Sequence, residues 1–217
     1  FPLNPGGPST LTRLNDVFLK HVGFRPENVR TINPAITKDT MYEHCQAYEN
    51  AIAEEGGIDV CLCEIAPSGT IAFNEPGSQQ SSYCRLVLLG NETRHRIAKD
   101  YNCDEAPTSA ITLGIANIAN ARRVLTMAWG ENSADIIRRT VEEAPTTAVP
   151  ASLLQGHPHV KVITDLAGAE DLTRISHPWK VTSCEWNDKL IRRAIVWLCS
   201  MTGKPILKLT DKDYKDW

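Results

Sequence analysis

The sequence contains no apolar run of 18 or more residues, so it predicts no membrane-spanning helix. It has no excess of positive charge either, because 23 basic and 26 acidic residues give a formal net charge of −3. The first residues lack the basic start and the apolar run of a signal peptide. We therefore expect neither nucleic acid nor a membrane as a partner. A length of 217 residues with 42% hydrophobic residues predicts a single domain, residues 1–217.

The seven cysteines are odd in number, irregularly spaced and without a C-x-x-C pair. Cys61 and Cys63 would place both thiols on one face of a strand. His157-Pro158-His159 looks like a metal dyad, but the proline and the lack of a nearby carboxylate or cysteine favour a loop. We therefore expect a reduced, cytoplasmic protein with buried thiols and no metal ligands.

Apolar spacing predicts helices that alternate with short strands. The helices are expected at residues 11–22, 39–55, 93–99, 134–144 and 187–202, and the strands at residues 58–66, 85–89, 110–113, 123–129 and 160–164. Nearly continuous apolar runs such as residues 58–66 are typical of strands that are buried on both faces. The alternation predicts a Rossmann-like α/β fold, a mainly parallel sheet with helices on both faces. Residues 177–217 form a helical C-terminal extension, in which residues 205–210 are expected to be an edge strand.

Several helix ends carry local signals. Gly56-Gly57 should end the second helix, and Gly203 followed by Pro205 should end the last one. Asn187 is the expected N-cap of that last helix. Asn132 or Ser133 can cap the helix that follows the fourth strand.

The loop after the first strand, residues 67–77, is the most unusual segment. Gly69 permits backbone conformations that other residues resist. Glu75 precedes a proline and is therefore held in an extended conformation, where its carboxylate could act as an acid or base. The alternative is an ordinary turn with a solvated or capping glutamate.

Two further segments could bind an anion. The turn at residues 130–134 precedes a helix, whose N-terminal N–H groups suit a phosphate, although an ordinary capped helix without a lysine is the alternative. In the basic run at residues 93–99, Arg94 or Lys99 could reach a phosphate, and a solvated helix face is the alternative. Residues 4–9 mimic a phosphate loop, but no strand precedes them, so we interpret them as a linker or turn.

The run GTIAFNEPG, residues 69–77, resembles the G-H-I-A-F-N-E-P signature of the glucosamine-6-phosphate deaminase/isomerase family. Residues 109–134 and 149–165 are similar to later segments of that family in the same order. The similarity covers roughly residues 10–175. The tail from His177 resembles a sub-branch in which such a domain often precedes a de-N-acetylase-like domain.

This resemblance implies a phosphorylated amino sugar as the ligand. The chemistry of the family opens the sugar ring, moves a proton between C1 and C2, and releases ammonia after attack by water. It needs no redox cofactor and no metal, but it does need positioned acid and base groups and a phosphate clamp. The resemblance is compatible with a homo-oligomer and sets no number of subunits.

The resemblance implies site residues, and several of them are substituted. Glu75 matches the glutamate of the signature, and Gly69 and Asn74 match residues of the same loop. Thr70 stands where the family has its ring-opening histidine, and a hydroxyl cannot shuttle a proton near neutral pH as an imidazole can. Ser68 stands where the family usually has the aspartate that orients this histidine.

The phosphate positions also differ from those of the family. Lys99 stands for an arginine, which removes the bidentate fork, and Ser133 stands for a lysine, which removes the charge. Glu64 and Ala66 replace glycines. The first βαβ unit of the family, with its glycine-rich loop and a proton-moving aspartate, is not visible in the sequence.

Three functions stay open at this point. The first is a deaminase/isomerase of amino-sugar phosphate metabolism. The second is a non-catalytic relative that binds a sugar phosphate, or serves as a regulatory or interaction domain. The third, a nucleotide-binding domain with an accidental signature, ranks last because no glycine fingerprint is present. Since a lost acid or base group typically costs roughly 100- to 10,000-fold, we expect impaired catalysis in this chain.

Overall fold

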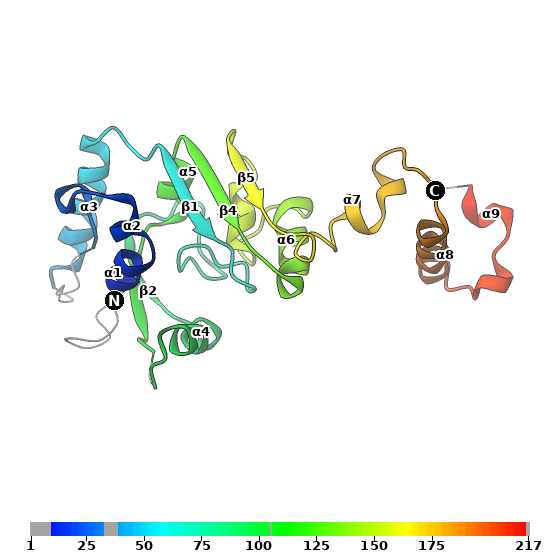
Figure 1. Cartoon of the computed structure of the whole chain (residues 1–217), viewed down its shortest axis with the longest axis horizontal. Coiled ribbons are helices and arrows are strands. Elements are labelled where there is room, and N and C mark those ends of the chain that lie inside the picture. Colours follow the sequence, from blue (N-terminus) through cyan, green and yellow to red (C-terminus); the bar gives the residue numbers. More distant parts are fainter. Residues whose placement is uncertain (1–9, 33–38, 105, 216–217) are drawn as a thin grey trace.

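The computed structural model describes residues 10–32, 39–104 and 106–215. The sequence-predicted phosphate-loop mimic at residues 4–9 lies outside these residues. Three strands form a parallel sheet in the order β1–β4–β5, with bounds Val60–Glu64, Arg123–Met127 and Val160–Ile163 (Figure 1). Helices flank this sheet, so the predicted α/β class is confirmed.

The other two strands form a separate antiparallel pair. β2, Arg85–Leu88, pairs with β3, Ser109–Thr112, and the helix α4, Asn91–Tyr101, connects them. Both strands lie where the apolar runs predicted them. Their direction of pairing depends on distant contacts, and a run of apolar residues does not encode it.

The longest of the remaining α-helices are α3 and α8, and the bounds are Thr10–Leu14 (α1), Lys20–Val22 (α2), Met41–Glu54 (α3), Ile115–Ala119 (α5), Ala134–Glu142 (α6), Thr173–Ser176 (α7), Asp188–Thr202 (α8) and Asp211–Tyr214 (α9). A π-helical turn, Asn15–Leu19, joins α1 to α2. Single 3₁₀ turns occur at Pro26–Asn28, Glu131–Ser133, Pro150–Leu154, Pro178–Lys180 and Ile206–Lys208.

The predicted edge strand at residues 205–210 is wrong. This segment forms the 3₁₀ turn Ile206–Lys208, in which the Lys208 N–H donates to the Pro205 carbonyl at 2.8 Å. A strand needs a partner along its length, whereas this turn satisfies its hydrogen bonds locally.

The predicted helix ends agree with the structure except at α6. Gly56 and Gly57 follow α3 with φ of +84° and +92°. Asn187 Oδ1 accepts a hydrogen bond from the Leu190 N–H at 2.9 Å at the start of α8, and Gly203, with φ of +67°, ends that helix. Ser133 precedes α6 but makes no side-chain cap, so that prediction is wrong.

The main core lies on one face of the parallel sheet. Cys63 of β1 and Val124 of β4 pack there with Ile118 of α5 and Ile137 of α6. The opposite face of β1 is open, because Val60 is 48% exposed and Leu62 is 62% exposed. The prediction that this strand is buried on both faces is therefore wrong.

The seven cysteines are all free, but only Cys45 and Cys63 are buried, so the prediction of buried thiols is wrong for the other five. The Sγ atoms of Cys61 and Cys63 lie 3.4 Å apart on one face of β1. Among the residues that the structure describes, no group of three or more metal-ligating side chains occurs. His157 lies in a loop, and its ring nitrogens contact the Ala121 carbonyl at 2.7 Å and the His159 N–H at 3.0 Å. Within the described ranges, no helix has the length and apolar character needed to cross a membrane.

Candidate functional site

The loop after β1 begins with a tight turn that only glycine fits. The Gly69 N–H donates to the Ala66 carbonyl at 2.8 Å, and the Ala66 N–H donates to the Thr70 carbonyl at 3.0 Å. Gly69 has φ of +79°, and a Cβ atom there would lie 2.9 Å from Cγ1 of Val149. Both the backbone conformation and the close approach of Val149 therefore require glycine.

A second tight turn follows at residues 71–74. Ala72 and Phe73 both have positive φ, +49° and +58°, although neither is a glycine. The Asn74 N–H donates to the Ile71 carbonyl at 2.8 Å, which gives the pattern of a type I′ turn. Non-glycine residues in this conformation store strain, which the surrounding contacts must hold in place.

Asn74 is the residue that holds this turn. Its side chain is fully buried, and Nδ2 donates to the carbonyls of Ile71 at 3.0 Å and Leu113 at 2.8 Å. The Thr112 hydroxyl donates to the Ala72 carbonyl from the same side. Asn74 Oδ1 is buried without a hydrogen-bond partner. The signature asparagine is therefore a structural clamp between the loop and the end of β3.

Glu75 follows this turn, and its side chain contacts the start of α4. Both of its carboxylate oxygens accept a hydrogen bond from the Gly90 N–H, at 3.0 and 2.9 Å. Gly90 is the N-cap residue of α4, so the carboxylate lies at the positive end of that helix. The position combines both sequence interpretations, because the glutamate caps a helix and also lines a cavity.

That cavity, of about 530 Å³, is formed by residues between Phe73 and Leu88. Its cation is Arg85, whose Nη2 lies 3.2 Å from the Ser78 hydroxyl. Burial lowers the pKa of Arg85 from its ordinary value. Glu75 and Arg85 thus give the cavity both signs of charge. We did not single out Arg85 from the sequence, where it marks only the start of a strand.

Thr70 and Ser68 form a hydroxyl pair beside the first turn. Their oxygens lie 2.9 Å apart, and Thr70 is 2% exposed. A buried hydroxyl that is engaged with another hydroxyl offers no group that titrates near neutral pH. The two residues therefore contact each other, but the pair lacks the chemistry of an imidazole held by a carboxylate.

The two predicted cations of α4, Arg94 and Lys99, differ in their exposure to solvent. Arg94 is half-buried, and its Nε atom is buried without a partner, whereas Lys99 is exposed in the last turn. Arg96 Nη1 lies 2.9 Å from Glu64 Oε1, an ion pair that ties α4 to the end of β1. The negative charge of Glu64 is therefore paired with Arg96 of α4.

The turn after β4 is occupied by groups of the protein itself. The Ser133 hydroxyl donates to the Trp129 carbonyl at 2.9 Å, and Ser133 is 6% exposed. Gly130 has φ of +81°, and its N–H donates to Asp165 Oδ1 at 3.0 Å. The same Asp165 oxygen accepts from the Gly168 N–H at 2.9 Å. These backbone donors hold the pKa of Asp165 below its ordinary value.

Asp165 is a residue that sequence reasoning missed. It follows β5, which is parallel to β4, so the loops after both strands leave the sheet at the same edge. That rule is the signal that could have found it. The Asp165 carboxylate therefore lies in the turn where the sequence predicts a phosphate. It already accepts the Gly130 N–H, which a bound phosphate would otherwise use. β1 and β4 are also parallel, so the loop that carries Glu75 begins at this edge as well.

The fold and these loops define the class of protein. Residues 8–163 match the family of glucosamine-6-phosphate isomerases and 6-phosphogluconolactonases, and the chain belongs to that family. Among solved structures, a monomeric glucosamine-6-phosphate deaminase is 30% identical with a TM-score of 0.69, covering 74% of this chain and 66% of that one. The 6-phosphogluconolactonase of Thermotoga maritima, 15% identical with a TM-score of 0.57, covers 76% of this chain and 67% of that one and shares the fold.

Curated relatives carry the deaminase name. A putative glucosamine-6-phosphate deaminase-like protein of Bacteroides thetaiotaomicron is 49% identical over 209 residues, which are 96% of this chain and 32% of that protein. The glucosamine-6-phosphate deaminase of Halothermothrix orenii is 39% identical over 157 residues, 72% of this chain and 64% of that protein. The chain thus spans between about a third and two thirds of these relatives.

Proposed function

We propose that this chain is a deaminase/isomerase-like domain for a phosphorylated amino sugar, and that its catalysis is impaired. The deaminase names of relatives at 39% to 49% identity support the substrate class. The loop of residues 69–77 supports it as well, because it keeps a carboxylate beside a cavity. We also propose a cytoplasmic location, which the seven free cysteines favour.

The single observation that carries the loss of catalysis is the environment of Thr70. Where the resemblance implies a histidine, a hydroxyl is 2% exposed and bonded to Ser68. No group at that position can donate and accept a proton near neutral pH. Glu75 would then work without an acid partner while its oxygens accept a backbone hydrogen bond.

Weak phosphate binding follows from the turn after β4. The turn supplies no cation, its serine hydroxyl is used by a backbone carbonyl, and Asp165 adds negative charge. A phosphate would have to displace this carboxylate or bind against it. We therefore propose weak sugar-phosphate affinity at this turn.

A second candidate is a non-catalytic sugar-phosphate-binding or regulatory domain. The observation that favours it is the cavity that holds both Glu75 and Arg85. An amino sugar phosphate carries an ammonium and a phosphate group, and this pair offers a counter-charge for each. Such a domain would recognise the sugar without turning it over.

Two measurements test the proposal. Ammonia release from glucosamine-6-phosphate should be far below about 1 per second, the lower end of ordinary enzyme turnover. Calorimetry should give a dissociation constant well above the micromolar range. Turnover near or above that rate refutes impaired catalysis, and binding tighter than micromolar without turnover favours the second candidate.

A further inference from the structure

Cys61 and Cys63 form a pair of thiols on β1 that takes no part in the candidate site. Their Sγ atoms lie 3.4 Å apart, and both cysteines are free. Side chains two residues apart on a strand point to the same face of the sheet, so the strand itself brings the two sulfurs together. The folded chain therefore holds a dithiol in which both sulfurs can bond to one atom.

The pair lies on the packed face of β1 and not on its open face. Cys63 is 7% exposed and belongs to the main core, together with Val124 of β4 and Ile118 of α5. Cys61 is half-buried and packs against the same cluster. In the sheet, Cys61 is paired with Val124. The surroundings of the pair are therefore apolar, and a ligand reaches the sulfurs from the side of Cys61.

The two thiols differ in acidity. The hydrogen bond between them lowers the pKa of Cys61 and raises the pKa of Cys63, and burial raises the pKa of Cys63 further. Because the thiolate is the reactive form of cysteine, Cys61 is the sulfur that bonds first to an incoming atom. Cys63 keeps its proton until a leaving group takes it. A ligand of this pair must therefore supply such a leaving group.

The distance between the sulfurs selects the kind of atom that both can bind. With bonds of about 2.3 Å, as in zinc–thiolate sites, a separation of 3.4 Å gives an angle of about 95° at the bound atom. Tetrahedral zinc needs about 109° and two further ligands, and no group of three metal-ligating side chains occurs in the described part of the chain. A linear Cu(I) ion would need the sulfurs about 4.6 Å apart, two such bond lengths. The narrow angle suits a pyramidal trivalent atom such as arsenic, whose third ligand can be a hydroxyl group.

We propose that Cys61 and Cys63 form a binding site for trivalent arsenic, which enters as arsenous acid. Two As–O bonds break and two As–S bonds form, and each thiol proton leaves with a hydroxyl group as water. The third hydroxyl group stays on the arsenic atom. No electron is transferred, so the step needs no oxidant and no reductant. The product is neutral, which suits an apolar site better than two thiolates and a metal cation would. This inference does not depend on the proposed function.

Titration of the full chain with sodium arsenite tests the site. The chain is kept reduced with a phosphine, which has no thiol of its own. We expect about one arsenic atom per chain to survive gel filtration, measured by elemental mass spectrometry, because one dithiol binds one atom. The intact mass should increase by that of arsenous acid less two waters. Dimercaptopropanol, a competing dithiol, should remove the arsenic.

Cys61→Ser should weaken arsenic binding by about 100-fold or more, because the bond to the second sulfur is then no longer an intramolecular step. Cys63→Ala should have the same effect. Circular dichroism checks that both variants stay folded. Peptide mapping after alkylation with iodoacetamide gives a readout on the parent chain itself, in which arsenic should protect Cys61 from alkylation.

Cys84→Ser is the matched control. Burial and the neighbouring Cys45 raise the pKa of Cys84 to about 12, so this variant also removes one of two nearby thiols. It should bind arsenic as the parent chain does.

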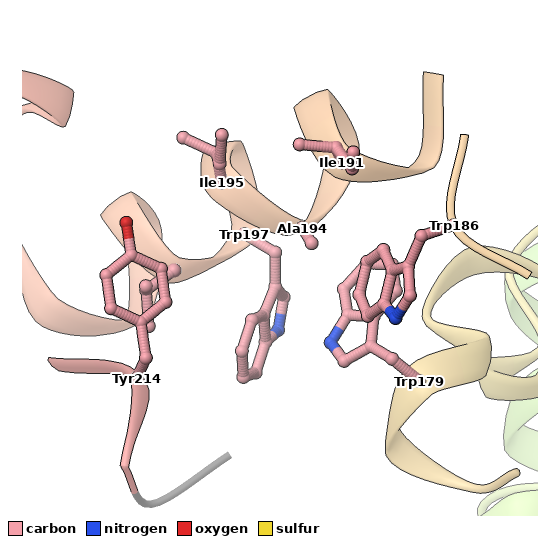
Figure 2. A pocket seen from close by; sticks show the side chains of 8 residues that line it. Trp179, Trp186, Ile191, Ala194, Ile195, Trp197 and Tyr214 are labelled. Carbon is pink, nitrogen blue, oxygen red and sulfur yellow. The ribbon is translucent and has the colours of Figure 1, made fainter. Parts of the chain in front are cut away.

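Cys199→Ser is a second control, in the C-terminal extension. Figure 1 shows α8, which carries Cys199, beyond α7 and away from the sheet. This change should also leave arsenic binding intact. The same helix lines an aromatic cavity of about 440 Å³ together with Trp179, Trp186 and Tyr214 (Figure 2).

Zinc chloride is the counter-probe, and gel filtration should remove it from the parent chain. Arsenic binding that Cys61→Ser leaves unchanged would overturn the proposal. So would an equal loss of arsenic in Cys84→Ser, which would mean that the pair on β1 is not selected by its geometry. Zinc that is retained by the parent chain and lost in Cys61→Ser would overturn the choice of arsenic.

Discussion

At the scale of single residues, Glu75 has two roles that can be separated. Its carboxylate accepts the Gly90 N–H and lies at the positive end of α4, so it stabilises that helix whether or not it meets a ligand. The cavity on its other side is where a sugar would be met. Because a substitution of Glu75 changes both roles, its effect on stability has to be measured separately from its effect on ligand binding.

Glu75→Gln should lower the free energy of unfolding by about 0.5–1 kcal/mol, because the amide loses the charge at the helix start. The matched control is Glu92→Gln, which removes a carboxylate from the same first turn of α4. It should cost less, because Glu92 loses only its charge, whereas Glu75 also loses the charge that strengthens its hydrogen bond from the Gly90 N–H. Urea denaturation measures both, and equal losses would contradict a specific contact between Glu75 and Gly90.

Restoring the family residues should not restore the enzyme. We expect Thr70→His with Ser133→Lys to raise affinity for glucosamine-6-phosphate more than turnover. The lysine adds positive charge at the turn after β4, whereas a histidine in a buried site still lacks the carboxylate that would orient it. Calorimetry and ammonia release on the double variant check this. A larger gain in turnover than in affinity would show that catalysis needs fewer of the family's catalytic groups than we infer.

Asp165 should make the stability of the chain depend on pH in the acidic range. The pKa of Asp165 is lowered in the folded state by the Gly130 and Gly168 N–H groups, so its contribution is fully present above the unfolded pKa of about 3.9. The contribution is lost as pH falls through the lower folded pKa. Asp165→Asn should therefore destabilise the chain at pH 7 and flatten the acid limb of its stability curve.

Thermal unfolding between about pH 2 and 7 measures this change, with Asp171→Asn as an exposed control. The same Asp165→Asn variant should bind inorganic phosphate more tightly than the parent chain, because a negative charge leaves the turn. Unchanged phosphate binding would argue that the turn does not take part in the anion site.

At the scale of elements, the strained turn at residues 71–74 is the most informative feature. Two consecutive non-glycine residues with positive φ are uncommon, and the buried clamp of Asn74 and Thr112 holds them. This rigid turn fixes the direction in which Glu75 leaves the loop. Backbone strain of this kind clusters at functional sites, so the strained turn supports a functional role for the loop that carries Glu75.

Ala72→Gly should stabilise the chain by up to about 1 kcal/mol, because glycine adopts positive φ without steric cost. Ala47→Gly, on the exposed side of α3, should destabilise it by about the same amount. Urea denaturation of the two variants compares one substitution in opposite backbone settings. A loss of stability in both would contradict strain at Ala72.

At the scale of the whole molecule, the chain divides into a body with a core and an extension almost without one. The body packs its core between one face of the sheet and α5, α6 and the Pro150–Leu154 turn. In α8 only Leu198 is buried. The open face of β1 and the aromatic cavity of the extension therefore lie outside the packed core.

The sequence by itself determined the features that depend on neighbours along the chain. The strand positions, the glycine stops after α3 and α8, and the Asn187 cap follow from local spacing and turn chemistry. The signature at residues 69–77 likewise identified the family and placed Glu75 after β1. The resemblance also placed Thr70 and Ser68 at positions where the family has a histidine and an aspartate.

Only the tertiary structure decided what depends on residues far apart in the chain. This group includes the antiparallel pairing of β2 with β3, the exposure of Leu62, the contact of Asp165 with Gly130 and the hydrogen bond that the Gly90 N–H donates to Glu75. Burial and pairing are properties of two surfaces at once, and a local pattern specifies one surface at most. That is why the sequence named the loops of the candidate site but could not say which of their donors and charges the protein already uses.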